Sequence, residues 1–223
     1  MAGLAALRAG AGIVRVFHKG DIGNTPMELI CQKWNKKEWS RELKRANAVF
    51  AGPGLGAGSR SWMKGISLPV VVDADALQKG ARFPTQAVLT PHRGEMLRLL
   101  GLKSAPQEED FLARCQKFAE RQPVILVLKG APTYLFAHGK PPLIIPRGDP
   151  GMATAGAGDV LTGILAGFLA QKLDLYDAAA VGTYLHALAG EKAAEEKTSY
   201  GVIAGDLIEF LPAAFQELMH EFE

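Results

Sequence analysis

The sequence has little of what marks a secreted, membrane-bound or nucleic-acid-binding protein. Its 223 residues include two cysteines, Cys31 and Cys115, which lie far apart and match neither a metal site nor a disulfide framework. We expect free thiols, which suit a reducing, cytoplasmic compartment. The net charge of +2 arises from 25 basic and 23 acidic residues, so no field of one sign is present to hold nucleic acid or a membrane surface.

Long hydrophobic runs are also missing. The longest uncharged apolar stretch, residues 160–170, is too short to span a bilayer. Arg8 interrupts the apolar start and no basic segment precedes it, so we do not expect a signal peptide. With 48% hydrophobic and 22% charged residues, the composition is that of a globular protein, and the length fits one large α/β domain.

What is present is an alternation of short apolar runs, glycine turns and helical patterns. Several runs are apolar at every position, which is typical of strands covered on both faces. We therefore predict an α/β fold with a central, mostly parallel sheet and helices on both faces. The predicted strands are residues 13–17, 48–51, 70–73, 87–90, 124–129, 133–137 and 143–145. The last two, on either side of residues 138–140, are expected to form a local antiparallel excursion. The predicted helices are residues 39–46, 94–100, 108–121, 156–171, 176–195 and 206–221, of which 156–171 is apolar all round and should be buried.

The strongest local signal is the run Gly148-Asp-Pro-Gly-Met-Ala-Thr-Ala-Gly-Ala-Gly-Asp-Val-Leu-Thr-Gly163. Gly156 and Gly158 bracket the turn that opens the buried helix, where backbone N–H groups can approach an anion. Asp159 follows in the first turn, where a carboxylate can take a proton from a hydroxyl that attacks phosphorus. The alternative is that Asp159 complements the helix dipole and the glycines serve packing alone. These residues by themselves do not separate the two interpretations.

The chain as a whole resembles the NAD(P)H-hydrate dehydratases, which are ribokinase-like proteins. The segments that carry the resemblance occur in the same order and rough spacing: Gly52-Pro-Gly-Leu-Gly56, Asp73-Ala-Asp-Ala-Leu77, Thr90-Pro-His-Arg-Gly-Glu-Met96, Lys129-Gly-Ala-Pro-Thr133 and the run from Gly148 to Gly163. The resemblance implies one ribokinase-like domain over residues 1–223. It also implies dehydration of the S form of NADH or NADPH hydrate with ADP or ATP as co-substrate, Mg²⁺ as cofactor, and a homo-oligomer, often a tetramer.

Site residues follow from the same resemblance. Asp159 is implied as the catalytic base that also binds the hydrated nicotinamide, and Glu95 as an acidic residue near Mg²⁺ and phosphate. Substrate binding is implied for Gly54, His92 and Asp159. Nucleotide binding is implied for Lys129, Gly130, Ala131, Pro132, Thr133, Gly156 and Gly158.

Each of these residues also has a purely structural alternative. His92 could simply begin a helix, and Lys129 could extend from a buried strand to solvent. Asp75 is better explained as an N-cap than as a ligand, and the glycines around Pro53 could serve turn geometry alone. Gly54, Asp73, His92 and Lys129 nevertheless all follow strand ends, where open α/β sheets bind their ligands.

The chain departs from the family pattern at several positions. It has Asp149 where Asn is usual, Arg93 where Pro is usual, and Ala157 in a turn that usually carries Thr. Residues 1–9 are predicted to be helical without an N-cap or a preceding strand. We therefore expect a domain without the family's usual first strand and glycine turn. Two further functions stay open: a small-molecule kinase that releases a phosphorylated alcohol, and a nucleotide-binding protein with little activity.

Overall fold

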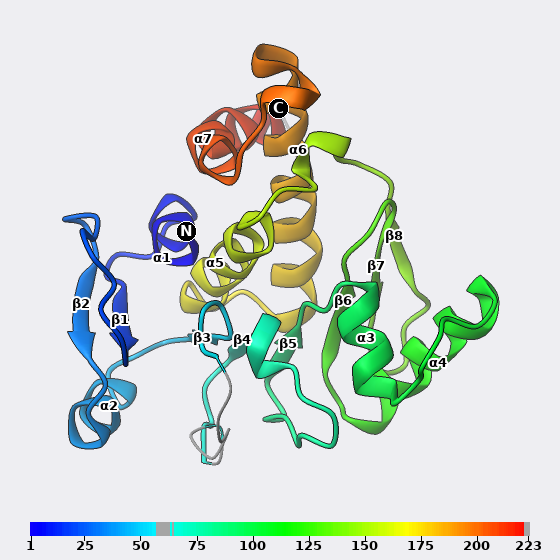
Figure 1. Cartoon of the computed structure of the whole chain (residues 1–223), viewed down its shortest axis with the longest axis horizontal. Coiled ribbons are helices and arrows are strands. Elements are labelled where there is room, and N and C mark those ends of the chain that lie inside the picture. Colours follow the sequence, from blue (N-terminus) through cyan, green and yellow to red (C-terminus); the bar gives the residue numbers. More distant parts are fainter. Residues whose placement is uncertain (57–62, 64, 221–223) are drawn as a thin grey trace.

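The computed structural model describes residues 1–56, 63 and 65–220, and it places a six-stranded sheet between two layers of helices (Figure 1). The strands are β1 (Arg15–His18), β2 (Ile30–Lys33), β3 (Val49–Ala51), β4 (Val70–Val72), β5 (Ala87–Leu89), β6 (Ile125–Leu128), β7 (Thr133–Phe136) and β8 (Leu143–Ile145). The α-helices are α1 (Ala2–Arg8), α2 (Lys36–Leu43), α3 (Arg93–Leu100), α4 (Glu108–Arg121), α5 (Ala157–Ala170), α6 (Leu175–Gly201) and α7 (Ala204–His220), with short 3-10 helices η2 (Ala74–Ala76) and η3 (Pro150–Met152).

The strands of the main sheet lie side by side in chain order, from β3 to β8. The four strands β3 to β6 are parallel, and β7 and β8 continue the sheet in antiparallel pairing. Both features were predicted, and both are confirmed. Because β3 to β6 run in the same direction, the residues that follow them meet at one edge of the sheet.

The sheet is apolar on both faces because helices cover both. Val71 and Val88 pair between β4 and β5 and face the layer that contains α5 and α6. Val70 and Val72 belong to the core on the other face, with side chains of α3 and α4. All four valines are fully buried, and each such side chain contributes about 1.5–3 kcal/mol of transfer free energy. This explains why the strand sequence shows no polar alternation.

Helix α5 is buried over most of its length, as its apolar sequence predicts. Helix α1 lies against it, and the helix predicted for residues 1–9 is confirmed. A Cβ on Gly163 would overlap the carbonyl oxygen of Ala2, and a Cβ on Gly167 would lie 2.9 Å from the carbonyl oxygen of Ala6. The two glycines, one turn apart, therefore let α1 and α5 approach closely.

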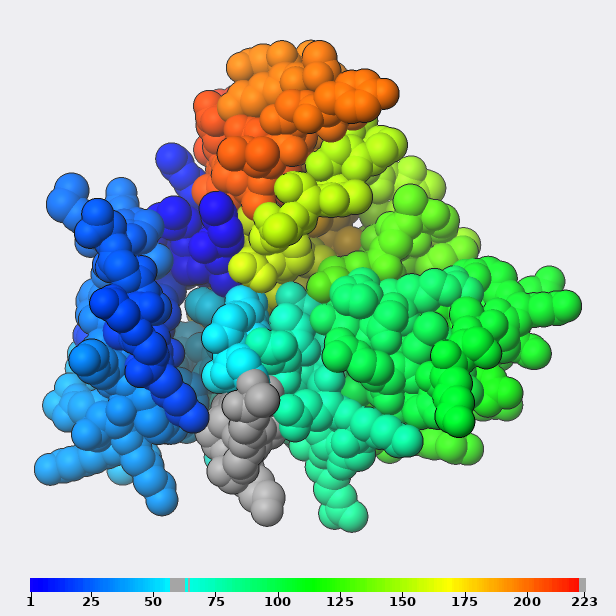
Figure 2. Space-filling view, viewed as in Figure 1, coloured from blue at the N-terminus to red at the C-terminus, as the bar shows by residue number. Residues whose placement is uncertain are grey.

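The N-terminal part of the chain differs from the prediction. The strand predicted at residues 13–17 forms β1, but β1 pairs in parallel with β2 in a separate two-stranded sheet. Strand β2 was not predicted, because its sequence Ile-Cys-Gln-Lys is short and half polar. The rings of Phe17, Trp34 and Trp39 pack together, with Phe17 and Trp39 centroids 5.3 Å apart. In the space-filling view this segment, in blue, forms one side of the molecule (Figure 2).

Several helix boundaries also differ from the prediction, most of all at the start of α2 and the end of α6. Helix α2 begins at Lys36, three residues before the predicted start, because the Asn35 side chain accepts hydrogen bonds from Lys37 N and Glu38 N. Helix α6 continues past residue 195 to Gly201, through a kink at Thr198 with φ 61° and ψ 154°. Helix α7 was predicted to end at residue 221, which lies outside the described residues.

Both cysteines are free, as predicted. Burial raises the pKa of the Cys115 thiol to about 12, so this side chain belongs to the core and not to any chemistry at neutral pH. Within the described part of the chain, no helix is both long enough and apolar enough to cross a membrane.

Candidate active site

Polar side chains gather at the edge of the sheet where the parallel strands end. Asp73 follows β4, Thr90 and His92 follow β5, and Lys129 follows β6. His92 and Lys129 form an isolated parallel bridge, and the Lys129 N–H donates to the carbonyl oxygen of Pro91 at 2.9 Å. The N-terminus of α5 lies against the same edge, because the Lys129 ammonium reaches Gly158. This is the region of an open α/β sheet where ligands bind.

The centre of this cluster is an ion pair between Asp73 and Lys129. The ammonium of Lys129 donates to Asp73 Oδ1 at 2.7 Å, and Asp73 itself is 1% exposed. The hydroxyl of Thr162, from α5, donates to Asp73 Oδ2 at 3.1 Å. Both carboxylate oxygens are thus hydrogen-bonded, which a buried charge requires. Asp73 links β4, β6 and α5.

Sequence reasoning placed Asp73 at the strand ends where ligands bind but gave it no role, and it did not identify Thr162. The available signal was the position of Asp73 directly after Val70–Val72, since a charge that ends a wholly buried strand needs a partner. Nothing in the apolar pattern of α5 singled out Thr162.

The two glycines of the predicted phosphate turn have different structural reasons. Gly156 is the N-cap of α5 and has φ +94°, a conformation that other residues rarely adopt. Gly158 lies within the helix, and a Cβ there would lie 3.0 Å from Lys129 Nζ and 3.5 Å from Asp73 Oδ2. The first N–H groups of a helix have no acceptor inside the helix, and the helix dipole favours an anion beside them. A positive ammonium beside this turn strengthens that preference.

Asp159 lies in the first turn of the same helix and within electrostatic reach of the ion pair. Burial raises the pKa of its carboxyl above the ordinary value, and the negative charge of Asp73 adds to the rise. The positive charges of the Met1 amino group and Lys129 act in the opposite direction. A raised pKa makes a carboxylate a stronger base, as a general base requires. Whether Asp159 is a general base or a residue that complements the helix dipole stays a prediction.

His92 and Glu95 form a capping box at the start of α3. His92 Nδ1 accepts from Gly94 N at 3.0 Å and from Glu95 N at 3.4 Å, while the His92 N–H donates to Glu95 Oε2 at 2.9 Å. The interpretation of His92 as a helix-entry residue is therefore confirmed. Its side chain remains 59% exposed, so a substrate contact through the rest of the ring stays a prediction.

Glu95 was expected near a metal ion. Its side chain is 7% exposed, and Oε2, which accepts the His92 N–H, also lies 4.0 Å from Lys129 Nζ. Among the residues that the structure describes, no three His, Cys, Asp or Glu side chains are grouped as a metal site. A single carboxylate such as Glu95 suits an ion whose other ligands are phosphate oxygens and water, as is common for Mg²⁺. It does not suit a metal held by the protein alone.

The remaining predicted residues lie in the loops after β3 and β6. In the loop after β6, Thr133 Oγ1 donates to the carbonyl oxygen of Gly130 at 3.0 Å, and the side chain of Lys129 extends to Gly158. Gly54 is exposed and has φ +62°, and within the described part of the chain nothing lies within 4 Å of the position that its Cβ would take. Binding roles for Gly54 and for Gly130 to Thr133 stay predictions.

Two loop residues are explained by packing. Gly52 has φ +135°, and a Cβ there would overlap the backbone carbonyl oxygen of Asp73, so the loop after β3 needs glycine at this position. The interpretation of Asp75 as an N-cap is wrong: Asp73 holds the N-cap position of η2, and Asp75 lies inside it. Asp75 instead accepts a hydrogen bond from Gly56 N at 2.8 Å and ties the two loops together.

The first half of the long glycine-containing run anchors the turn onto α6. Asp149 Oδ1 accepts from Gly151 N at 2.7 Å, and Asp149 Oδ2 accepts from Ser199 Oγ at 2.8 Å. Met152 packs where Gly190 of α6 has no side chain. These contacts hold Gly151 and Met152 against α6, just before the turn at Gly156.

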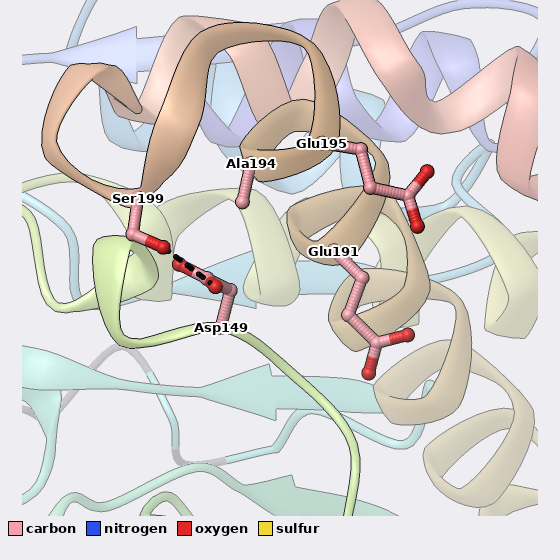
Figure 3. A pocket seen from close by; sticks show the side chains of 5 residues that line it. All are labelled: Asp149, Glu191, Ala194, Glu195 and Ser199. Carbon is pink, nitrogen blue, oxygen red and sulfur yellow. Dashed lines mark hydrogen bonds between the residues drawn. The ribbon is translucent and has the colours of Figure 1, made fainter.

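A depression of about 370 Å³ lies beside this anchor and not at the Asp159 cluster (Figure 3). Asp149 and Ser199 are hydrogen-bonded to each other on one side of it, and Glu191 and Glu195 extend from α6. The hydrogen bond from Arg147 lowers the pKa of Glu191, so this carboxyl stays ionised. The lining is acidic and does not suit a phosphate ligand. Its residues are Asp149, Glu191, Ala194, Glu195 and Ser199.

The family model described as NAD(P)H-hydrate dehydratase matches residues 1–213. The chain belongs to this family. It is 34% identical to the ADP-dependent (S)-NAD(P)H-hydrate dehydratase of Lactococcus lactis, over 93% of this chain and 80% of that protein. It is 38% identical to the bifunctional NAD(P)H-hydrate repair enzyme Nnr of Moorella thermoacetica, over 100% of this chain and 47% of that protein. The chain thus spans about half the length of the bifunctional relatives that it matches.

Solved structures confirm the ribokinase-like fold. The ADP/ATP-dependent NAD(P)H-hydrate dehydratase of Bacillus subtilis, co-crystallised with ATP and Mg²⁺, superposes with a TM-score of 0.83 at 26% identity, covering 97% of this chain and 83% of that one. A ribokinase-like superfamily protein of Enterococcus faecalis gives a TM-score of 0.82 at 28% identity, covering 97% of this chain and 81% of that one.

Proposed function

We propose that this member of the NAD(P)H-hydrate dehydratase family dehydrates the S form of NADH or NADPH hydrate with ADP or ATP as phosphoryl donor. The observation that supports this most directly is the arrangement at the α5 N-terminus. There the Lys129 ammonium and the Gly156–Gly158 turn make an anion site, and the Asp159 carboxylate with its raised pKa lies in the same turn. Phosphoryl transfer to a hydroxyl needs both parts side by side.

In the first step, the terminal phosphoryl group lies at the start of α5 beside Lys129. Asp159 takes the proton from the hydroxyl on ring carbon 6 of the hydrated nicotinamide. The hydroxyl oxygen then bonds to the terminal phosphorus, and the bond from that phosphorus to the rest of the nucleotide breaks, leaving AMP from ADP or ADP from ATP. The backbone N–H groups and Lys129 stabilise the charge on the transferred group.

In the second step, the ring nitrogen lone pair expels phosphate from carbon 6, and a proton leaves carbon 5. The double bond between carbons 5 and 6 is restored, which regenerates NADH or NADPH. Phosphate is a far better leaving group than hydroxide, and this is why a nucleotide is consumed. Glu95 is the residue that would hold Mg²⁺, which when bound would supply neutralisation of phosphate charge.

The test is recovery of reduced-nicotinamide absorbance from each hydrate, with ADP and ATP supplied separately. We expect recovery that depends on nucleotide and that Asp159→Asn slows by about 10²–10⁴. A stable phosphorylated product without recovered absorbance would indicate a kinase instead. Nucleotide binding without turnover would indicate a binding protein.

We also propose that the chain assembles as a homo-oligomer, a tetramer by resemblance, and works in the cytoplasm. Light scattering of the purified protein tests the assembly, and fractionation of its native host tests the location.

A further inference from the structure

Lys129 is held between two buried carboxylates. Its ammonium lies 2.7 Å from Asp73 Oδ1 and 4.0 Å from Glu95 Oε2, and its side chain is 21% exposed. On the third side lies Gly158, whose missing Cβ leaves space for the ammonium. The two distances show that Asp73 holds the hydrogen bond and that Glu95 contributes only a longer-range attraction.

Asp73 is itself fixed in place. Its N–H donates to the carbonyl oxygen of Ala51 at 3.0 Å, and its second carboxylate oxygen accepts from Thr162 on α5. Its carbonyl oxygen fills the space that a side chain at position 52 would need. A group held by the strand, the helix and the neighbouring loop can orient a flexible lysine. A lysine without such a partner would lose that orientation to rotamer freedom.

We infer that Asp73 is a positioning residue that acts through Lys129 and directs its ammonium to the phosphate turn at Gly158. This inference rests on the proposed function, because it assigns the ammonium to the phosphates of ADP or ATP. Asp73 touches neither ligand. Its effect on nucleotide affinity therefore requires Lys129.

Simple charge repulsion and positioning predict opposite results for Asp73→Asn. Removing a negative charge beside an anion site should tighten ADP binding if charge alone matters. Loss of the charged hydrogen bond that orients Lys129 should instead weaken ADP binding, by about 10-fold to 100-fold, the range for a hydrogen bond to a charged group.

The experiment is a double-mutant cycle on ADP affinity, measured by calorimetry. Wild type, Asp73→Asn, Lys129→Met and the double variant are compared. We expect Asp73→Asn to weaken ADP binding when Lys129 is present. In the Lys129→Met background, the same change should cause almost no further loss of ADP affinity. Equal or tighter ADP binding by Asp73→Asn would overturn the inference. The same loss of ADP affinity with Lys129 and with Met at position 129 would also overturn it, because a general structural role produces that result.

Glu42→Gln is the matched control. Glu42 is also a buried carboxylate, paired with Arg15 at 3.0 Å, but it lies on α2, outside the cluster. We expect it to lower stability without changing ADP affinity. If Asp73→Asn does not fold, Thr162→Val replaces it in the cycle, since this change frees Asp73 Oδ2 and leaves every charge in place. Thr162→Val should lower ADP affinity only when Lys129 is present. Thr162→Ser, which keeps the hydroxyl, should bind ADP as tightly as wild type.

Failure of the proposed function is distinguishable from failure of the positioning role. A wild type that binds neither ADP nor ATP would refute the proposed function. The position of Lys129 Nζ in crystals of wild type and Asp73→Asn would still decide the positioning role. An ammonium that stays beside Gly158 without the Asp73 carboxylate overturns it, and one that leaves this position supports it.

Discussion

The Lys129 ammonium lies in the space that Gly158 leaves by having no side chain. An ideal Cβ on Gly158 would lie 3.0 Å from Lys129 Nζ, closer than these atoms approach in ordinary contacts. Gly158 has ordinary helical backbone, so its identity is explained by this contact and not by conformation. Gly158 thus connects the first turn of α5 to a side chain from the loop after β6.

Gly158→Ala should separate stability from nucleotide binding. Alanine is the better helix former by up to about 1 kcal/mol, and this gain offsets part of the cost of moving the ammonium away from Asp73, so thermal stability should change little. The added methyl group displaces the ammonium, and ADP affinity should fall by about tenfold, or roughly 1.4 kcal/mol. Gly205→Ala is the control, because Gly205 lies in the first turn of α7 with nothing near its Cβ position. Unchanged ADP affinity in Gly158→Ala would contradict this account of Gly158.

Asp159→Asn should lose turnover and gain stability at neutral pH. Loss of a general base typically lowers turnover by about 10²–10⁴, while ADP binding should persist. The pKa of Asp159 is raised in the folded state, so the folded protein is destabilised by the ionised carboxylate at pH values above the ordinary pKa of 3.8. The stability gain of the variant should therefore vanish as pH falls toward 3.8. A fully active variant that is less stable by about 1 kcal/mol would instead show a dipole-complementing residue.

His186 should make the protein sensitive to mild acid. Its Nε2 lies 3.0 Å from the carbonyl oxygen of Ala157, and burial lowers its pKa from 6.5 to about 4. The unfolded chain then binds one more proton than the folded chain between these values, so stability is lost as pH falls from 6.5 toward 4. The loss is up to about 1.4 kcal/mol per pH unit. Urea denaturation across this range should show a shallower pH slope for His186→Gln, while exposed His138→Gln should keep the wild-type slope.

Gly52→Ala should destabilise the fold far more than Gly54→Ala. Position 52 combines φ +135° with an overlap between the new Cβ and the carbonyl oxygen of Asp73. We expect a loss of about 3 kcal/mol or more. Position 54 has φ +62° and open space, so alanine there should cost about 1 kcal/mol. Denaturant midpoints measure both. If Gly54 contacts substrate as predicted, Gly54→Ala will also raise KM for the hydrate without a comparable loss of stability.

The sequence by itself determined the sheet, the buried helix and the family. Runs such as Val70–Val72 are apolar at every position because helices cover both faces, and this burial is visible in local composition. The turn from Gly156 to Asp159 was equally visible, since a helix start and its anion preference depend on neighbouring residues. Each of these features depends on a small number of residues that are neighbours in the chain.

Only the tertiary structure decided which polar groups meet. Asp73 and Lys129 are 56 residues apart, and Asp73 and Thr162 are 89 apart; both contacts depend on the order of β4 and β6 in the sheet and on the placement of α5. The same holds for β2, which became a strand only by pairing with β1. Local periodicity reports burial and backbone preference, whereas the pairing of distant side chains depends on how the packed elements are arranged in space.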